Sequence, residues 1–152
     1  MPQSIEDVLA DPRRSGVYRT DASADDLAAA GASHGFRFFH IHGDRIRTVA
    51  DLFLSFKEQL KATYLSAEED WNGLDEYLVD MDEFPEAPGF VIFYDRYDDF
   101  AQANPNKWEV LLKLLSEATK SWLEKGKPMF VFLRGKAADD ESLQFVSRSR
   151  TS

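Results

Sequence analysis

The sequence predicts one α/β domain: a small, mainly parallel β-sheet of three to four strands, packed by helices. Three observations favour this class. Strand-like and helix-like segments alternate along the chain. The run 90–94 is continuously apolar, which is typical of a parallel strand buried on both faces. Finally, 152 residues, 43% of them hydrophobic, are enough for one compact core.

Four segments have the composition of strands. They are short, rich in β-branched and aromatic residues, and bounded mostly by glycine or proline. They lie near 17–20, 36–42, 90–95 and 129–134. Because helical segments separate them, they are expected to join one largely parallel sheet.

Helices are expected before and between the strands, where apolar side chains recur at helical spacing. The five expected helices cover 4–9, 24–32, 48–60, 67–81 and 104–125. Ser23, Thr48 and Asn104 are residue types that cap helix N-termini. Gly35 and Gly126 are expected to end two of these helices.

The domain is expected to span 16–135. Residues 1–15 form a polar N-terminal segment, and residues 136–152 form a polar, serine-rich tail that we expect to be loosely attached. No internal repeat or low-complexity linker divides the region between them. A single domain therefore fits the sequence best.

Charge and composition limit the function. The net charge is −9, from 18 basic and 27 acidic residues, which argues against nucleic acid as a direct partner and favours a cationic one. The absence of cysteine excludes disulfides and thiol nucleophiles. No signal peptide, membrane-spanning run or glycine-rich phosphate loop is found. We therefore expect a cytoplasmic protein, monomeric when free, without membrane contact or cofactor.

The segment 62–95 contains no Lys, Arg or His. It nevertheless holds ten carboxylates: Glu68, Glu69, Asp70, Asp75, Glu76, Asp80, Asp82, Glu83, Glu86 and Asp95. A charge run of this kind is usually only a solvated helix face. The positions of these carboxylates on a helix, however, indicate a binding surface.

A helix is expected to begin near Ala67, because Ser66 followed by Glu69 has the pattern of a capping box. Its apolar stripe would face the core and consists of Trp71, Leu74, Tyr77, Leu78 and Met81. The opposite side would carry Asn72, Asp75, Glu76 and Val79. Such an anionic face imitates the phosphates of a nucleic acid and attracts a basic cleft.

These residues resemble the barstar family. The family's helix reads Asn-Trp-Asp-Ala-Leu-x-Asp-Cys-Leu-x-Asp, and this chain has Asp70-Trp71-Asn72-Gly73-Leu74-Asp75-Glu76-Tyr77-Leu78-Val79-Asp80. The segment 38–52 is similar to the family's first strand, turn and helix start. The later strands and the long helix keep the family's order, so the likeness covers about 36–134, and 17–32 resembles a βα extension of longer members.

The resemblance implies a barstar-like sheet and a stoichiometric inhibitor, not an enzyme, whose partner is a basic ribonuclease or nuclease toxin. The family's two principal inhibitory carboxylates fall on Asn72 and Glu76, and its loop aromatic falls near Tyr64 or Leu65. Asn72 is neutral where the family has a charge, and Glu76 is one methylene longer than Asp. The family's loop glycine has no clear counterpart. The predicted partner-binding residues are Tyr64, Glu68, Glu69, Asp70, Trp71, Asn72, Asp75, Glu76, Val79 and Asp80.

Two other functions remain open. A protein-interaction module without inhibitory activity would use the same acidic helix. A metal-dependent hydrolase would use His40 and His42, which point to the same face of a strand, together with His34 and Asp44. A Ser–His–acid triad is not supported, because the sequence has no Gly-x-Ser-x-Gly turn.

Overall fold

The computed structural model describes residues 3–62, 65, 69–81, 84–135 and 143–147. Its elements follow one another in this order: β1 (Gln3–Ser4), α1 (Ile5–Leu9), η1 (Pro12–Arg14), β2 (Gly16–Thr20), α2 (Ala24–Ala32), β3 (Arg37–His42), η2 (Gly43–Arg45), α3 (Val49–Gln59), α4 (Trp71–Asp80), β4 (Phe90–Asp95), α5 (Tyr97–Ala103), α6 (Pro105–Glu124), β5 (Met129–Arg134) and β6 (Phe145–Ser147).

The strands form one sheet in the order β1-β6-β2-β5-β4-β3, and every neighbouring pair is parallel. The prediction of a barstar-like sheet of three to four strands is therefore wrong, because the sheet has six strands in the described residues. The two unpredicted strands, β1 and β6, contain two and three residues. Strands this short carry too few side chains to show an alternating pattern.

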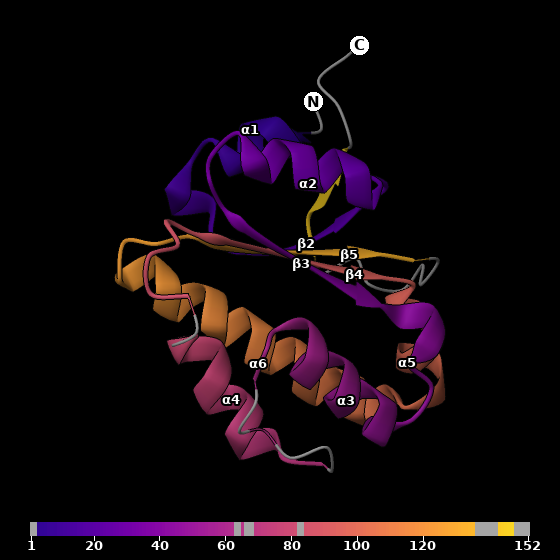
Figure 1. Ribbon diagram of the computed structural model, residues 1–152. Helices are drawn as coiled ribbons and strands as arrows, with labels where there is room; N and C mark the ends of the chain where they lie inside the picture. Colours follow the sequence, from indigo (N-terminus) through magenta and orange to yellow (C-terminus); the bar gives the residue numbers. More distant parts are fainter. Residues whose placement is uncertain (1–2, 63–64, 66–68, 82–83, 136–142, 148–152) are drawn as a thin grey trace.

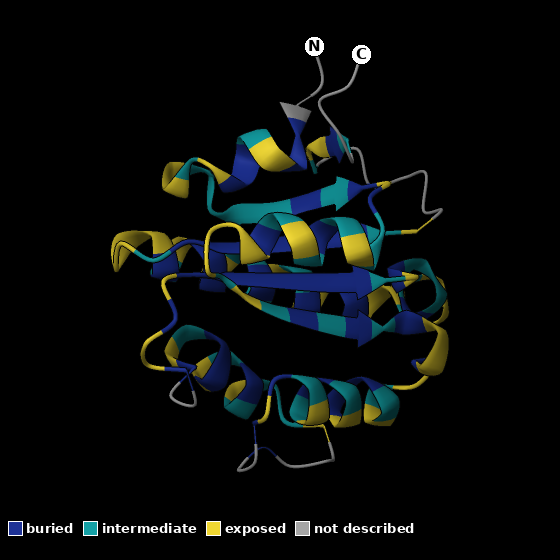
Figure 2. Cartoon of the chain, turned by 45° about the horizontal axis from the view of Figure 1, so that its top comes forward, coloured by how far each residue is buried: buried dark blue, intermediate teal, exposed yellow. Residues whose placement is uncertain are grey.

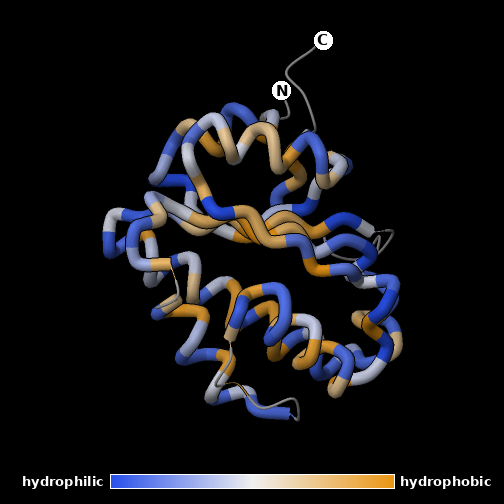
Figure 3. The backbone as a smooth tube through the Cα atoms, in the orientation of Figure 1, coloured by the Kyte–Doolittle hydropathy of each residue, from blue (hydrophilic) through white to orange (hydrophobic). Residues whose placement is uncertain are grey.

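Helices cover both faces of the sheet (Figure 1). Helices α1 and α2 lie on one face, and α3, α4, α5 and α6 lie on the other. Alternate side chains of the central strands enter two separate apolar cores. In β4, for example, Ile92 belongs to the larger core and Phe93 to the smaller one. Strands β4 and β5 are accordingly buried on both faces (Figure 2), and hydrophobic residues concentrate in the sheet (Figure 3).

Three helices begin with reciprocal caps. Ser4, Ser23 and Thr48 each accept a hydrogen bond from the third helical residue, whose carboxylate accepts one from the cap's backbone N–H. At α6, by contrast, Asn104 does not cap the helix with its side chain. Its Nδ2 instead donates to the carbonyl oxygen of Arg47 at 2.9 Å, so the side chain ties α6 to the start of α3.

A tight backbone contact joins the end of β3 to the end of β4. Gly43 is buried, and a Cβ atom there would lie 2.0 Å from the carbonyl oxygen of Asp95 and 2.5 Å from that of Arg96. Arg96 adopts a left-handed conformation, with φ of 54°, and leads directly into α5. The sequence does not predict α5, because this short helix follows β4 after one residue, Arg96, which makes no side-chain cap.

Part of the expected tail belongs to the sheet. Val146 in β6 is buried, and its carbonyl oxygen accepts a hydrogen bond of 2.6 Å from Oγ1 of Thr20. Strand β6 pairs with both β1 and β2, so it connects the first strand to the rest of the sheet. Within the described ranges, no helix has the length and apolar character needed to cross a membrane.

Candidate protein-binding site

Helix α4 packs against α6 at the surface of the larger core (Figure 1). Its inner side buries Leu74, Tyr77 and Leu78. Its outer side exposes Asn72, Glu76 and Asp80, with Asp75 half-buried beside them. We call these last four residues the acidic α4 face.

The helix begins later than the sequence predicts. Asp70 is the N-cap, and its carboxylate accepts a hydrogen bond of 3.0 Å from the backbone N–H of Gly73. The expected start near Ala67 is therefore wrong in position. Ser66 and Ala67 lie outside the described residues. An Asp side chain that caps the backbone three residues onward competes with continuation of the helix through it.

The carboxylate of Glu69, just before the helix, accepts hydrogen bonds from other side chains of the protein. Its Oε2 atom accepts hydrogen bonds of 2.5 Å from Nζ of Lys107 on α6 and of 2.5 Å from Nε1 of Trp71. These bonds, the one from Lys107 foremost, lower the pKa of the Glu69 carboxyl. This carboxylate holds the start of α4 against α6 and is less available to a partner than an unpaired one.

The far end of α4 is held by α6 as well. Nε1 of Trp122 donates to the carbonyl oxygen of Leu78 at 2.7 Å, and Nζ of Lys125 donates to that of Val79. The hydroxyl of Tyr77 donates to the carbonyl oxygen of Leu60, after α3. Because both ends and the inner side are anchored, the acidic α4 face is fixed before any partner arrives.

The predicted partner-binding residues divide into three groups. Tyr64 and Glu68 lie outside the described residues. Glu69, Asp70, Trp71 and Val79 take part in the protein's own structure. Asn72, Asp75, Glu76 and Asp80 form the acidic α4 face.

Val79 differs most from expectation, whereas Trp71 packs against the larger core, as its place on the apolar stripe predicts. Val79 was predicted on the outward side, but it is half-buried and packs against the larger core. Trp71 lies edge-on to Phe53 of α3, with 4.9 Å between the ring centres. Packing against α6 and the larger core buries a wider strip of α4 than the apolar stripe indicates.

The carboxylates of the acidic α4 face carry unneutralised charge. Among the described residues, Asp75, Glu76 and Asp80 form no ion pair, whereas Glu69 pairs with Lys107. Sequence reasoning missed Lys107 on α6 and Lys125 just after it, the two lysines that contact the ends of α4. No local pattern reveals them, because they are separated from α4 by 27 or more residues.

A family comparison places this helix in context. The profile described as "Barstar (barnase inhibitor)" matches residues 36–134, which is well over half of the chain. The chain belongs to the barstar family. This confirms the resemblance seen in the sequence, and it assigns the chain to a family of inhibitors. The matched barstar region contains the whole acidic α4 face.

Solved structures show the fold at a more distant level. Cdc6p from Pyrobaculum aerophilum is similar with a TM-score of 0.61 and 15% identity, over 97% of this chain and 44% of that one. A structure of Drosophila ORC bound to AT-rich DNA and Cdc6 is similar with a TM-score of 0.53 and 9% identity, over 93% of this barstar-family chain and 50% of that one. This chain spans about half the length of those proteins. No match is found among curated proteins.

The histidine pair does not gather a metal-binding group. The rings of His40 and His42 lie 3.9 Å apart, but His34 stacks on Phe36 instead, with ring centres 5.2 Å apart. In the part of the chain that the structure describes, no three His, Asp or Glu side chains are grouped as a metal site. Nε2 of His40 is buried without a hydrogen-bond partner there.

The half-buried imidazole of His40 predicts a pH-dependent stability. Burial, followed by repulsion from His42, lowers the pKa of His40 below its ordinary 6.5. The unfolded chain then binds this proton more readily, so the free energy of unfolding should fall as pH decreases through 6.5 toward the lower folded pKa. Urea unfolding at successive pH values measures it. The variant His40→Gln should flatten this part of the profile, and an unchanged slope would contradict the assignment.

Proposed function

We propose that this barstar-family protein is a stoichiometric inhibitor of a basic microbial ribonuclease and blocks its active site with the acidic α4 face. One observation carries the proposal. Asp75, Glu76 and Asp80 present unneutralised charge on a helix whose ends are fixed to α6. The family's description as a barnase inhibitor supports the class of target.

The inhibitory mechanism follows from charge. A ribonuclease binds its substrate's phosphates with Lys and Arg side chains, and carboxylates on a rigid helix can take the same positions. Glu76 is the expected anchor, because it is exposed and takes the place of a principal family carboxylate. Since the helix is ordered before binding, little conformational entropy is lost when the complex forms.

Asn72 is expected to set target choice. It lies one helical turn before Glu76 and is exposed beside it. A neutral amide cannot neutralise a buried arginine as a carboxylate does. We therefore infer that the target differs from barnase at the position that Asn72 meets, offering a neutral hydrogen-bonding group there. The inhibitor is expected to act as a monomer in the cytoplasm, in the cell that makes the nuclease.

A titration tests the function directly. The purified protein is added in steps to each member of a panel of basic microbial ribonucleases at fixed concentration. For the matching enzyme, activity should fall linearly and reach zero at one inhibitor per enzyme. If no ribonuclease in the panel loses activity at a large excess of the protein, the inhibitory function is wrong.

Salt should affect how fast the complex forms. Charges on the acidic α4 face steer a basic partner only within a Debye length, about 10 Å at 0.1 M ionic strength. The association rate constant, measured by stopped-flow fluorescence, should therefore fall at least about tenfold when salt is raised from about 0.02 M to about 0.5 M. The dissociation rate should change much less. An association rate that is independent of salt would contradict electrostatic steering.

A further inference from the structure

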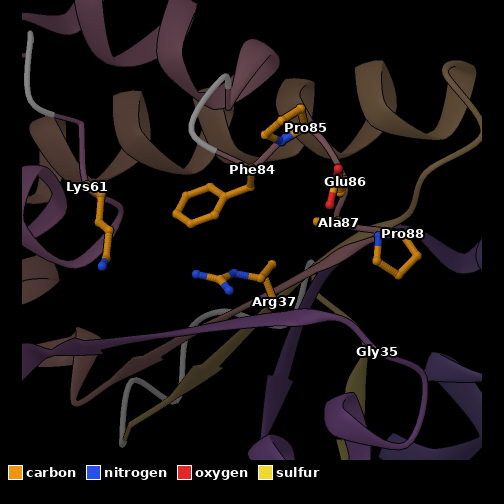
Figure 4. A pocket seen from close by; sticks show the side chains of 8 residues that line it. All are labelled: Gly35, Arg37, Lys61, Phe84, Pro85, Glu86, Ala87 and Pro88. Atoms are coloured by element: carbon orange, nitrogen blue, oxygen red, sulfur yellow. The ribbon is translucent and has the colours of Figure 1, made fainter.

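A second surface feature lies away from the acidic α4 face. A hollow of about 580 Å³ opens near the start of β3 and is lined by Gly35, Arg37, Lys61 and the segment 84–88 (Figure 4). Arg37 is the first residue of β3, Lys61 follows the end of α3, and 84–88 connects α4 to β4. None of the four residues of the acidic α4 face lines it.

Arg37 is held in place by an aromatic ring. Its guanidinium carbon lies 4.6 Å from the ring centre of Phe84, which is a cation–π contact. Phe84 is itself buried and meets Phe39 edge-on, with ring centres 5.1 Å apart. The ring therefore supports one side of the guanidinium, while its N–H groups remain directed along the hollow (Figure 4).

Neither cation of the hollow has an ion-pair partner among the described residues. In the described residues, which do not include Asp82 and Glu83, neither Arg37 nor Lys61 forms an ion pair or a side-chain hydrogen bond. Acidic residues outnumber basic ones by 27 to 18 in this chain. Two unpaired cations at one hollow are therefore unusual here, and an anion between them would relieve their repulsion.

We propose that this hollow binds a small phosphate monoester. The lining has two cations, Arg37 and Lys61, against one carboxylate, Glu86, so it favours an anion, and a phosphate group has enough oxygens to contact both cations. The planar guanidinium offers paired N–H donors that fit phosphate oxygens, and Lys61 adds a point charge. Glu86, also in the lining, offers an acceptor for hydroxyl groups of the ligand. The volume falls in the range of small-molecule sites, about 300–1,000 Å³, so a sugar phosphate or a mononucleotide fits.

Calorimetric titration of the full chain tests this binding. The probes are inorganic phosphate, ribose 5-phosphate and adenosine 5′-monophosphate, each against its unphosphorylated counterpart where one exists. The phosphorylated probes should bind, and ribose and adenosine should not. Binding of inorganic phosphate without either ester would overturn the monoester proposal, and tighter binding of one ester than of inorganic phosphate would support it. Absence of saturable binding by all three up to about 10 mM would overturn the proposal.

Matched variants locate the site. Arg37→Gln and Lys61→Gln should each weaken binding of the best probe by about tenfold or more, since each removes charge-assisted hydrogen bonds. Lys113→Gln removes an exposed, unpaired charge from α6 and should leave the affinity within about twofold. If all three variants lost affinity equally, the effect would come from net charge and not from this hollow. If Arg37→Gln and Lys61→Gln kept the wild-type affinity, the ligand would bind elsewhere.

The site is independent of the proposed inhibitory function. Arg37→Gln and Lys61→Gln should leave ribonuclease inhibition unchanged, and Glu76→Ala should leave phosphate-monoester binding unchanged. Circular dichroism of each variant shows whether it is folded, and Arg37 and Lys61 are both exposed, so folding should be retained. If the assays show no ribonuclease inhibition, phosphate-monoester binding can still be tested, and the reverse also holds.

Discussion

Replacing Glu76 by alanine should weaken inhibition of the matching ribonuclease by more than about 30-fold, which corresponds to about 2 kcal/mol. The truncation leaves a cationic group of the enzyme's phosphate site buried without its counter-charge, and that desolvation dominates the loss. The effect should be found mainly in the dissociation rate. Inhibition constants and dissociation rates from the same titration measure it. The free energy of unfolding of the free protein should not change, because Glu76 is exposed.

Two further variants separate anchoring from general charge. Glu6→Ala removes the same charge from the exposed side of α1, on the opposite face of the sheet, and should leave inhibition nearly unchanged. Asn72→Asp restores the charge that the barstar family carries at this position and should tighten binding to barnase-like ribonucleases. If Glu76→Ala and Asn72→Asp both behave as the wild type toward every ribonuclease, the acidic α4 face has no inhibitory role.

Gly43→Ala should destabilise the protein by about 3 kcal/mol or more, a large share of a typical total of about 5–15 kcal/mol. The added Cβ would lie 2.0 Å from the carbonyl oxygen of Asp95 and 2.5 Å from that of Arg96. Both contacts are to backbone, so no side chain can rotate to relieve them. The end of β4 must move away from β3, and the urea midpoint of unfolding should fall accordingly.

Gly16 provides the matched control. A Cβ atom there would meet its nearest neighbours at 3.5 Å and 3.6 Å, which is ordinary contact, and the residue lies in β2. Gly16→Ala should therefore be neutral or stabilise by about 0.5 kcal/mol, because alanine loses less backbone entropy on folding. Equal unfolding midpoints for Gly43→Ala and the wild type would show that the backbone contact is absent.

Much of the secondary structure could be predicted from local patterns. The four longer strands, β2 to β5, and the helices α1, α2, α3 and α6 lie close to their expected ranges. The longer elements show a period, and the five-residue α1 has a capping serine at its start. The size of the sheet could not be predicted in this way. Strands β1 and β6 exist only because residues far apart in sequence pair with each other, as Gln3 does with Val146.

The candidate site was predictable in part. Helical spacing alone places Asn72, Asp75 and Glu76 on one side of α4, and that side is the outward one. The same spacing also puts Val79 there, where α6 and the core cover it. The spacing does not indicate that Lys107 forms an ion pair with Glu69, because the lysine belongs to another helix. Tertiary contacts of this kind decide which carboxylates of an acidic run remain free.

The position of β5 has a consequence for the order in which the protein folds. This strand pairs with β2 on one side and β4 on the other, yet it begins at residue 129, after both of them in the sequence. During synthesis, β2 and β4 therefore each keep an unpaired edge until β5 has been made. Only then can β5 pair with both strands and join them in one sheet. Such long-range parallel pairing slows folding and leaves strand edges open to aggregation meanwhile.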